Sequence, residues 1–151
     1  MSYYRERLWP AAGIYIALTL VIPASLLVFL PINALVGVIT AGVLYLGCAG
    51  LLTATAPVIE VTGAHFTAGR ARLPLDVIGT ATAYHGAEAT MERGQQLDAR
   101  AWLLIRGWVT PVVKIEVTDP RDPTPYWLVS TRKPDDIVAA LKTAKSRSAE
   151  T

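Results

Sequence analysis

The stretch PAAGIYIALTLVIPASLLVFLPINALVGVITAGVLYLGCAGLLTATAPVI, residues 10–59, runs for fifty residues without Asp, Glu, Lys, Arg or His. A helix that spans a bilayer needs about 20 apolar residues, so this stretch has room for two spans and a turn. The turn is expected at LPIN, residues 30–33, because proline and asparagine favour a break. We therefore predict antiparallel transmembrane helices over residues 10–30 and 33–56, with Pro23 kinking the first.

The second predicted helix is rich in small side chains. Small residues let helix backbones approach closely in lipid, so they predict a packing surface. Its members are Gly37, Ala41, Gly42, Gly47 and Gly50. The first helix alone can occupy this surface, and the alternatives are another membrane protein or a second copy of the chain.

Positive charges flank the apolar run on both sides. Arg5 and Arg7 precede it and Arg70 and Arg72 follow it, whereas the turn between the helices has no charge. The positive-inside rule therefore predicts a multi-pass protein of the cell (inner) membrane with both termini, including segment 1–9, in the cytoplasm. The run is far longer than the apolar core of a signal peptide, which favours a retained hairpin.

The polar region, residues 57–147, alternates apolar and polar side chains in short stretches. VVKIEV, residues 112–117, and YWLVST, residues 126–131, are typical of strands, and six or seven strands are expected in all. Residues 85–100 lack clear periodicity and fit either a loop or a weak helix.

An amphipathic helix is expected after the last strand, over residues 134–145. Pro134 suits its first position, and Asp135 and Asp136 complement the positive end of the helix dipole. Residues 148–151 are expected to be a tail. The predicted fold is a membrane α + β protein, in which the hairpin precedes a small antiparallel β domain. That domain is a partly open barrel of the pleckstrin-homology-like type, capped by the C-terminal helix.

The composition argues against several classes of protein. Acidic and basic side chains are nearly balanced in the polar region, whereas binding to nucleic acid usually requires a basic excess. Cys48 is the single cysteine, so no intramolecular disulfide can form. Asp119 and Asp122 each precede a proline in turn-forming sequence, and His65 and His85 lack partners at ligand spacing. We therefore expect no metal, no cofactor and no catalytic site.

The stretch DPRDPTPYWLVSTRKPDD, residues 119–136, is unusually dense in aromatic and charged side chains. One interpretation assigns it to a rigid loop, a strand and a helix start, all required by folding. The other makes it part of a recognition surface, because aromatic residues and arginine are the usual anchors of interfaces. The candidate surface consists of Arg106, Trp108, Tyr126, Trp127 and Arg132.

Four motifs give the chain a family resemblance. They are YRERLWP (4–10), ARLPLDVIG (71–79), IRGWV (105–109) and TDPRDPTPYWLVSTRKP (118–134). With them the chain resembles an actinobacterial family of small membrane proteins known as a domain of unknown function. The resemblance implies two transmembrane helices and a cytoplasmic domain, and it implies no activity.

These observations predict a non-catalytic membrane protein. Its cytoplasmic domain is expected to serve as a protein-interaction or accessory module of a membrane or cell-envelope complex, with the lipid bilayer and a membrane protein or a second copy as partners. The alternatives are a sensor of lipid headgroups or small ligands at the inner leaflet, and a component of an enzyme or transporter.

Overall fold

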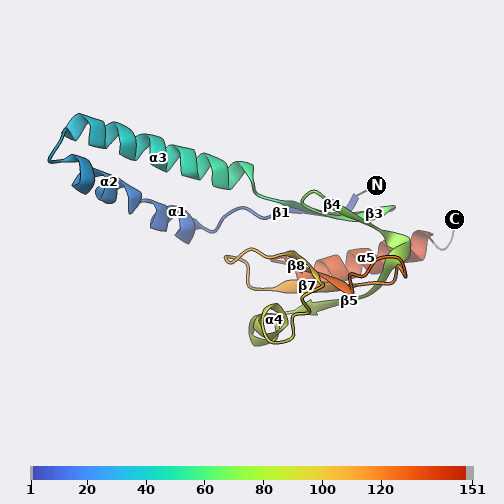
Figure 1. Ribbon diagram of the computed structural model, residues 1–151. Coiled ribbons are helices and arrows are strands. Elements are labelled where there is room, and N and C mark those ends of the chain that lie inside the picture. The colour runs from blue at the N-terminus through green and yellow to red at the C-terminus, as the bar shows by residue number, and fades with distance from the viewer. Residues whose placement is uncertain (1, 149–151) are drawn as a thin grey trace. The chain divides into compact units, whose positions relative to one another are not determined.

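The computed structural model describes residues 2–148 (Figure 1). The chain forms two compact units, each with its own packing. Residues Trp9–Ala56 form a helical unit, and the residues up to Leu8 join those from Pro57 onward in a β unit. Two N-terminal apolar helical segments, sheets rich in antiparallel pairs and a C-terminal helix agree with the predicted order of elements.

The first half of the helical unit is broken once. It consists of α1 (Ala12–Leu18) and α2 (Val21–Phe29), separated at Thr19 and Leu20. Pro23 has no N–H to donate to the carbonyl of Thr19, so the helical ladder is interrupted one turn before the proline rather than at it. The Ile22 N–H donates to the Thr19 carbonyl instead, at 3.0 Å.

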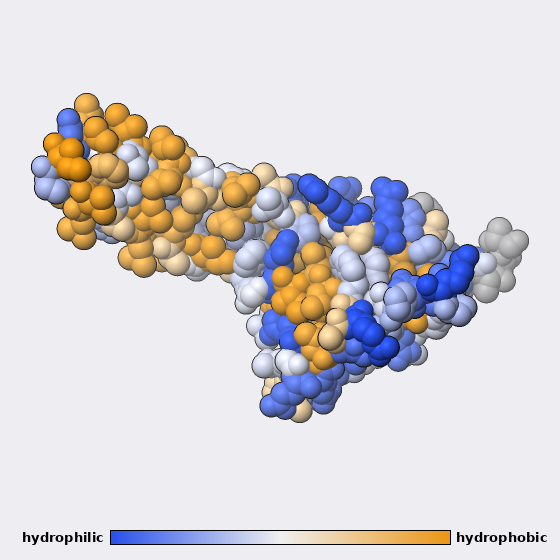
Figure 2. Space-filling view, viewed as in Figure 1, coloured by the Kyte–Doolittle hydropathy of each residue, from blue (hydrophilic) through white to orange (hydrophobic). Residues whose placement is uncertain are grey.

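The second half is one continuous helix, α3 (Ala34–Ala54). Asn33 caps it, as its side-chain oxygen accepts from the Leu35 N–H at 2.9 Å. The 12–29 and 34–54 segments are each long and apolar enough to cross a membrane, judged by length and composition. Figure 2 shows that the surface of this unit is mostly hydrophobic.

The small residues of α3 divide into two sets. Gly37 and Ala41 are buried against α2, and a Cβ atom at Gly37 would lie only 3.2 Å from Phe29 Cβ. Gly42, Gly47 and Gly50 have open space around them, with no other described atom within 4 Å of an added Cβ. The first set fits the expected packing between the two helices, and the second set lies on a surface of α3 that α2 leaves open.

The first sheet of the β unit includes the N-terminus of the chain. Its strands β1 (Ser2–Arg7), β2 (Val58–Thr62), β3 (His65–Ala68) and β4 (Ala71–Pro74) are neighbours in that order, all antiparallel. Segment 1–9 is expected to precede the helices as a separate cytoplasmic segment, whereas its residues Ser2–Arg7 form β1, which pairs along β2. The Leu8 N–H extends this pairing to the Pro57 carbonyl, at 2.9 Å.

The second sheet follows a short 3-10 turn, Leu75–Val77. It contains β5 (Ile78–Tyr84), β6 (Trp102–Leu104), β7 (Val112–Val117) and β8 (Tyr126–Ser130), in the order β5-β7-β8-β6. Strand β6 is parallel to β8, which departs from the expected all-antiparallel domain. After β6 the chain crosses the end of β8 and enters β7 on the other side of β8. Strand β6 therefore pairs with β8 alone and forms an edge of the sheet.

The segment that the sequence left open, 85–100, contains a helix followed by a loop. Helix α4 (Gly86–Arg93) buries Ala89 in a small cluster with Val112 and Leu128 from the second sheet. An ion pair of 2.9 Å between Glu92 and Lys114 adds a partly buried polar tie between the helix and β7. The helix therefore covers the outer face of the second sheet.

The main core lies between the inner faces of the two sheets and helix α5 (Pro134–Ser148). Alternating residues of each strand supply it, including Phe66 and Val113, and α5 contributes Ile137 and Leu141. The helix begins at Pro134 as expected and continues past the predicted end at 145. The predicted tail falls mainly on 149–151, outside the described residues.

Candidate functional site

Two members of the predicted surface, Tyr126 and Trp127, are core residues. All five residues of β8 are buried, because the strand has the main core on one face and the α4 cluster on the other. The Trp127 ring stacks on Trp102 at 4.1 Å between centroids and meets the edge of Phe66 at 6.3 Å. The Tyr126 hydroxyl accepts from the Asp98 N–H at 2.8 Å. Neither side chain can anchor a partner, which corrects the predicted surface at these positions.

The proline-rich loop before β8 is explained by its own turns. The Asp119 side chain accepts from the Arg121 N–H at 2.9 Å, and Asp122 accepts from the Thr124 N–H at 2.9 Å. The Thr124 N–H also lowers the pKa of the Asp122 carboxyl. Within residues 2–148, no group of three or more His, Cys, Asp or Glu side chains is arranged to hold a metal ion. These aspartates therefore have a local structural role.

The remaining members of the predicted surface are Arg106, Trp108 and Arg132. They lie at the same end of the β unit as two further arginines. This end is marked by Leu8 and Pro57, where the chain leaves for the helices and returns from them. The Gly69 N–H donates to the Val58 carbonyl at 2.8 Å, which brings the β3–β4 turn there. Because β6 and β8 are parallel, the residues that follow both strands lie at one end of the second sheet. The Arg132 N–H donates to Glu6, the neighbour of Arg7, so this end lies beside the end of β1. We call the four arginines gathered in this way the arginine rim: Arg7, Arg70, Arg106 and Arg132.

Glu6 ties the first strand to the start of α5 beside the rim. Its carboxylate accepts from the Thr131 hydroxyl at 2.6 Å, from the Tyr4 hydroxyl at 2.9 Å and from the Arg132 N–H at 3.2 Å. Burial raises the pKa of the Tyr4 hydroxyl, and Glu6 adds to this rise while Thr131 opposes it. This Glu6 junction joins YRERLWP to STRKP, two of the motifs that carry the family resemblance.

The loop after β6 holds Arg106 and Trp108. The Arg106 N–H donates to the Ser130 hydroxyl at 3.0 Å, and the guanidinium lies 5.9 Å from the centre of the Trp108 ring. The Arg93 side chain donates to the Val109 carbonyl at 3.3 Å and steadies the loop from α4. The Trp108 indole nitrogen is buried and has no hydrogen-bond partner among the described residues.

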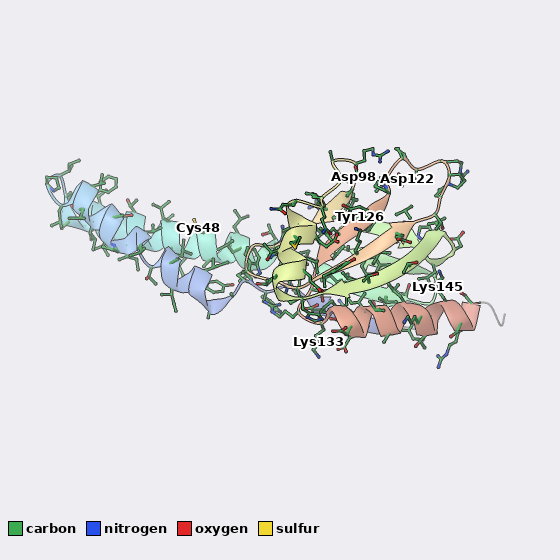
Figure 3. All side chains as sticks on the ribbon, turned by 90° about the horizontal axis from the view of Figure 1, so that it is seen from below. Cys48, Asp98, Asp122, Tyr126, Lys133 and Lys145 are labelled. Atoms are coloured by element: carbon green, nitrogen blue, oxygen red, sulfur yellow. The ribbon has the colours of Figure 1, made fainter. Side chains whose placement is uncertain are left out.

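The carboxylates near the rim are each engaged by another group. Glu6 lies 3.7 Å from the Arg132 guanidinium, and Asp135 lies 2.8 Å from His85. Asp136 lies 3.7 Å from Lys133, which Figure 3 shows at the opposite end of α5 from Lys145. In the described chain, no carboxylate lies within 4.0 Å of Arg70 or Arg106. Glu6 thus pairs with one member of the rim, and the positive charge without a carboxylate partner in the described chain is that of Arg70 and Arg106.

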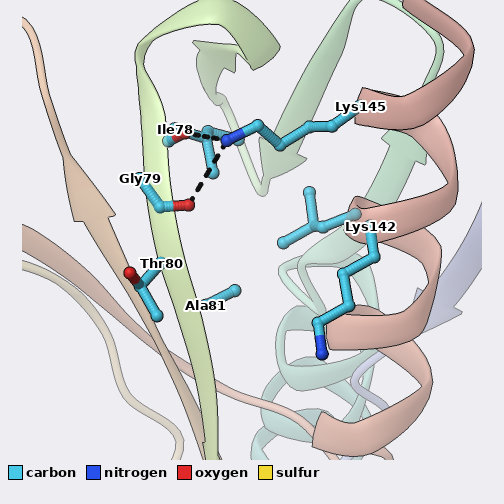
Figure 4. Close-up of a pocket in the computed structure, with 7 residues that line it drawn as sticks. Ile78, Gly79, Thr80, Ala81, Lys142 and Lys145 are labelled. Atoms are coloured by element: carbon cyan, nitrogen blue, oxygen red, sulfur yellow. Dashed lines mark hydrogen bonds between the residues drawn. The ribbon is translucent and has the colours of Figure 1, made fainter.

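A cavity of about 340 Å³ lies between β5 and α5, with Lys142 and Lys145 along one side (Figure 4). Lys145 donates to the Ile78 carbonyl and, at 3.5 Å, to the Gly79 carbonyl. A Cβ atom at Gly79 would lie 2.9 Å from the Thr118 methyl group, so glycine is needed for the close approach of β5 to β7. Lys145 thus donates hydrogen bonds to carbonyls at the start of β5, where the pairing with β7 is irregular. This structural role explains why the Lys145 side chain points into the cavity.

Comparison with known proteins identifies the family. The model of a family described as a protein of unknown function, DUF3093, matches residues 3–141. The chain belongs to the DUF3093 family. The matched span runs from β1 into α5, so it includes both units and all four rim arginines. No curated protein and no solved structure matches the chain.

Sequence reasoning missed Arg7 and Arg70 as members of the site. Both were used to predict orientation, and that signal also placed them next to the apolar run. Their proximity to Arg106 and Arg132 depends on the pairing of β1 with β2, which a six-residue polar strand before a long apolar run does not reveal.

Proposed function

We propose that this chain is an integral protein of the cell membrane, with the hairpin spanning the bilayer and both termini in the cytoplasm. Most of the exposed large apolar side chains belong to the helical unit, among them Leu27, Ile32 and Leu46. Exposed apolar surface of this extent is costly in water and suits lipid. The flanking arginines favour the cytoplasmic placement of the β unit.

The β unit acts in this proposal as a pleckstrin-homology-like binding module without catalytic activity. Without α4 and β6, which are inserted between β5 and β7, the β unit has seven antiparallel strands, β1–β4 in one sheet and β5, β7 and β8 in the other. One amphipathic helix, α5, follows them, and pleckstrin-homology-like domains have this order of elements. The buried Glu92 and the partly buried Glu6 are both occupied in structural contacts, Glu92 with Lys114 and Glu6 at its junction. That engagement favours a binding role over acid–base chemistry.

The observation that carries the proposal is the insertion of the hairpin between two paired strands. The chain leaves the sheet after β1 and returns to it in β2, and the Leu8 N–H bonds to the Pro57 carbonyl across the insertion. The helical hairpin is therefore an insertion between two neighbouring strands of the module, connected to it at both of its ends. This connection suits an accessory component that works together with membrane proteins.

The second set of small residues on α3 offers a surface for a partner helix. Gly42 and Gly50 lie on one helical face, with Leu46 between them at intervals of four residues. Small residues favour close helix contacts in lipid, and α2 leaves this face open. The partner is a membrane protein or a second copy of the chain.

Disulfide cross-linking in native membranes tests this proposal. Leu46→Cys, made with Cys48→Ala, places a single thiol on the open face, whereas native Cys48 shares the stripe of Gly37 and Ala41. We expect an added oxidant to join the Leu46→Cys thiols of two chains, or to join this thiol to a cysteine of one membrane protein, identified by mass spectrometry after affinity purification. Wild-type Cys48 is the matched control and should cross-link much less.

Two results would decide against the proposal. Extraction of the chain from membranes by alkaline carbonate would show that the hairpin is not inserted. Equal, weak cross-linking from both positions, together with recovery of the chain alone, would remove the accessory role while leaving insertion intact.

A further inference from the structure

We infer that the arginine rim docks onto the phosphate groups of anionic phospholipids in the membrane that the hairpin spans. The inference rests on the proposed insertion of the hairpin, and it adds a ligand and a binding surface to that proposal. Its basis is the placement of four arginines, one at the end of β1 and three in separate connections, at the end of the β unit where the chain leaves for the helices.

The chain itself limits how far the rim can lie from the helices. Strand β1 ends at Arg7 and α1 begins at Ala12, while α3 ends at Ala54 and β2 begins at Val58. An extended chain covers at most about 3.6 Å per residue, so these connections hold the end of the sheet within about 18 Å of the helix ends. This limit applies whatever direction the hairpin takes.

The chemistry of the rim fits a phosphate surface. Guanidinium groups bind phosphate through paired N–H donors, and Arg70 and Arg106 have no carboxylate within 4.0 Å to compete in the described chain. The Arg106 guanidinium lies 5.9 Å from the centre of the Trp108 ring, which packs against the core and supports this arginine from below. Several arginines spread over one surface suit many headgroups better than a single enclosed ligand.

The opposite end of the β unit differs in charge arrangement. There Arg100 pairs with Asp98 at 3.0 Å and Arg121 with Asp119 at 3.4 Å, each within its own loop. At the end where the chain leaves for the helices, by contrast, Arg70 and Arg106 have no carboxylate within 4.0 Å in the described chain. These two distal arginines supply matched controls, because removing them lowers the net charge by the same amount.

The test uses the full chain in nanodiscs of phosphatidylcholine, with or without roughly one third phosphatidylglycerol, and measures amide hydrogen exchange. We expect exchange in the 69–71 turn and the 105–109 loop to slow by roughly fivefold in anionic discs at low salt. The slowing should disappear near 1 M salt, where the Debye length falls to about 3 Å. Arg70→Gln/Arg106→Gln should abolish it, and Arg100→Gln/Arg121→Gln should retain it.

Several outcomes would overturn the inference. Equal exchange of the wild-type chain in both discs would do so, as would full slowing in the Arg70→Gln/Arg106→Gln chain. Slowing produced by inorganic phosphate in phosphatidylcholine discs would assign the rim to a soluble anion. Because Arg106 is partly buried, Arg70→Gln alone is measured as well, and its exposed turn position leaves the fold intact.

Failure of this inference is distinguishable from failure of the proposed function. Carbonate extraction reports insertion of the hairpin without reference to lipid charge. An inserted chain that is indifferent to phosphatidylglycerol would remove lipid docking alone, and a chain that is extracted from the membrane would remove both.

Discussion

The two sheets of the β unit are assembled in different ways. The second sheet uses residues from one continuous stretch, 78–130, whereas the first depends on a strand that precedes the entire helical hairpin. The first sheet is joined to α5 through the Glu6 junction, and the second contributes Trp127 and Val113 to the core. The difference indicates that β1 is the part of the domain most dependent on distant residues, and the predictions below test that dependence.

The largest effect is expected from removing β1. A fragment of residues 57–148 loses the fully buried Leu8, the Glu6 junction and a whole row of strand hydrogen bonds. We expect a loss of several kcal/mol, comparable with the total stability of a small domain, which is about 5–15 kcal/mol. Circular dichroism and thermal melting should show no cooperative transition.

A fusion supplies the control for this fragment. Because the Leu8 N–H bonds to the Pro57 carbonyl, an Asn-Gly turn can replace residues 9–56 and join 2–8 to 57–148. This chain should melt cooperatively. If fragment and fusion melt alike, β1 contributes little and the contrast between the sheets is lost.

Truncation in the core is the next largest effect. Trp127→Ala should lower the free energy of unfolding by about 3–5 kcal/mol, because the ring contacts Trp102 in its own sheet and Phe66 in the first sheet. Chemical denaturation of the full chain in detergent measures it, with Trp127→Phe as the milder variant. A cost below about 1 kcal/mol, usual for exposed positions, would contradict the burial of this ring.

Neutralising the Glu6 junction should have a smaller effect, confined to the first sheet. Glu6→Gln keeps the shape but leaves the Thr131 and Tyr4 hydroxyls poorly paired, at an expected cost of about 1–3 kcal/mol. Arg5→Gln, at an exposed position of the same strand, should stay within about 0.5 kcal/mol of wild type. Equal melting of the two variants would show that the junction adds nothing to stability.

The smallest expected effect is a dependence on alkaline pH. The pKa of Tyr4 in the first sheet and of Tyr84 in the second is raised above the ordinary value of 10.0, mainly by burial in each case. A raised pKa stabilises the fold below pH 10 and ceases to do so as pH rises above it, since the unfolded tyrosines ionise first. Stability should therefore fall above pH 10.

Two single variants separate the contributions of the sheets. Tyr4→Phe should flatten the alkaline decline more than Tyr84→Phe, because the rise in pKa is larger at Tyr4. The measurement is the melting temperature as a function of pH. If neither variant changes the fall in melting temperature above pH 10, other ionisable groups cause that fall.

Local patterns in the sequence were sufficient for much of this fold. Apolar length predicted the two helical segments, and alternation in VVKIEV and YWLVST predicted strands whose faces agree with the two observed clusters. Pro134 and the two aspartates after it predicted the start of α5. Each of these features depends only on residues that are close together in the chain. A single sequence is therefore enough to predict them.

The rest depended on contacts between distant residues. The strand order β5-β7-β8-β6 and the pairing of β1 with β2 have no local signature. For the same reason Tyr126 and Trp127 were assigned to a surface, because alternation cannot show that a strand is covered on both faces. Arg106, Trp108 and Arg132 were selected by residue type, and their neighbours Arg7 and Arg70 emerged only from topology.

The position of the hairpin inside a strand pair has a consequence for biosynthesis. A chain that inserts both spans as proposed returns to the side of the membrane where β1 waits, and only then can the first sheet close. A chain with one span inserted leaves β1 and β2 in different compartments, with Leu8 and the partners of Glu6 uncovered. Completion of the first sheet therefore requires that both spans be inserted in the proposed topology.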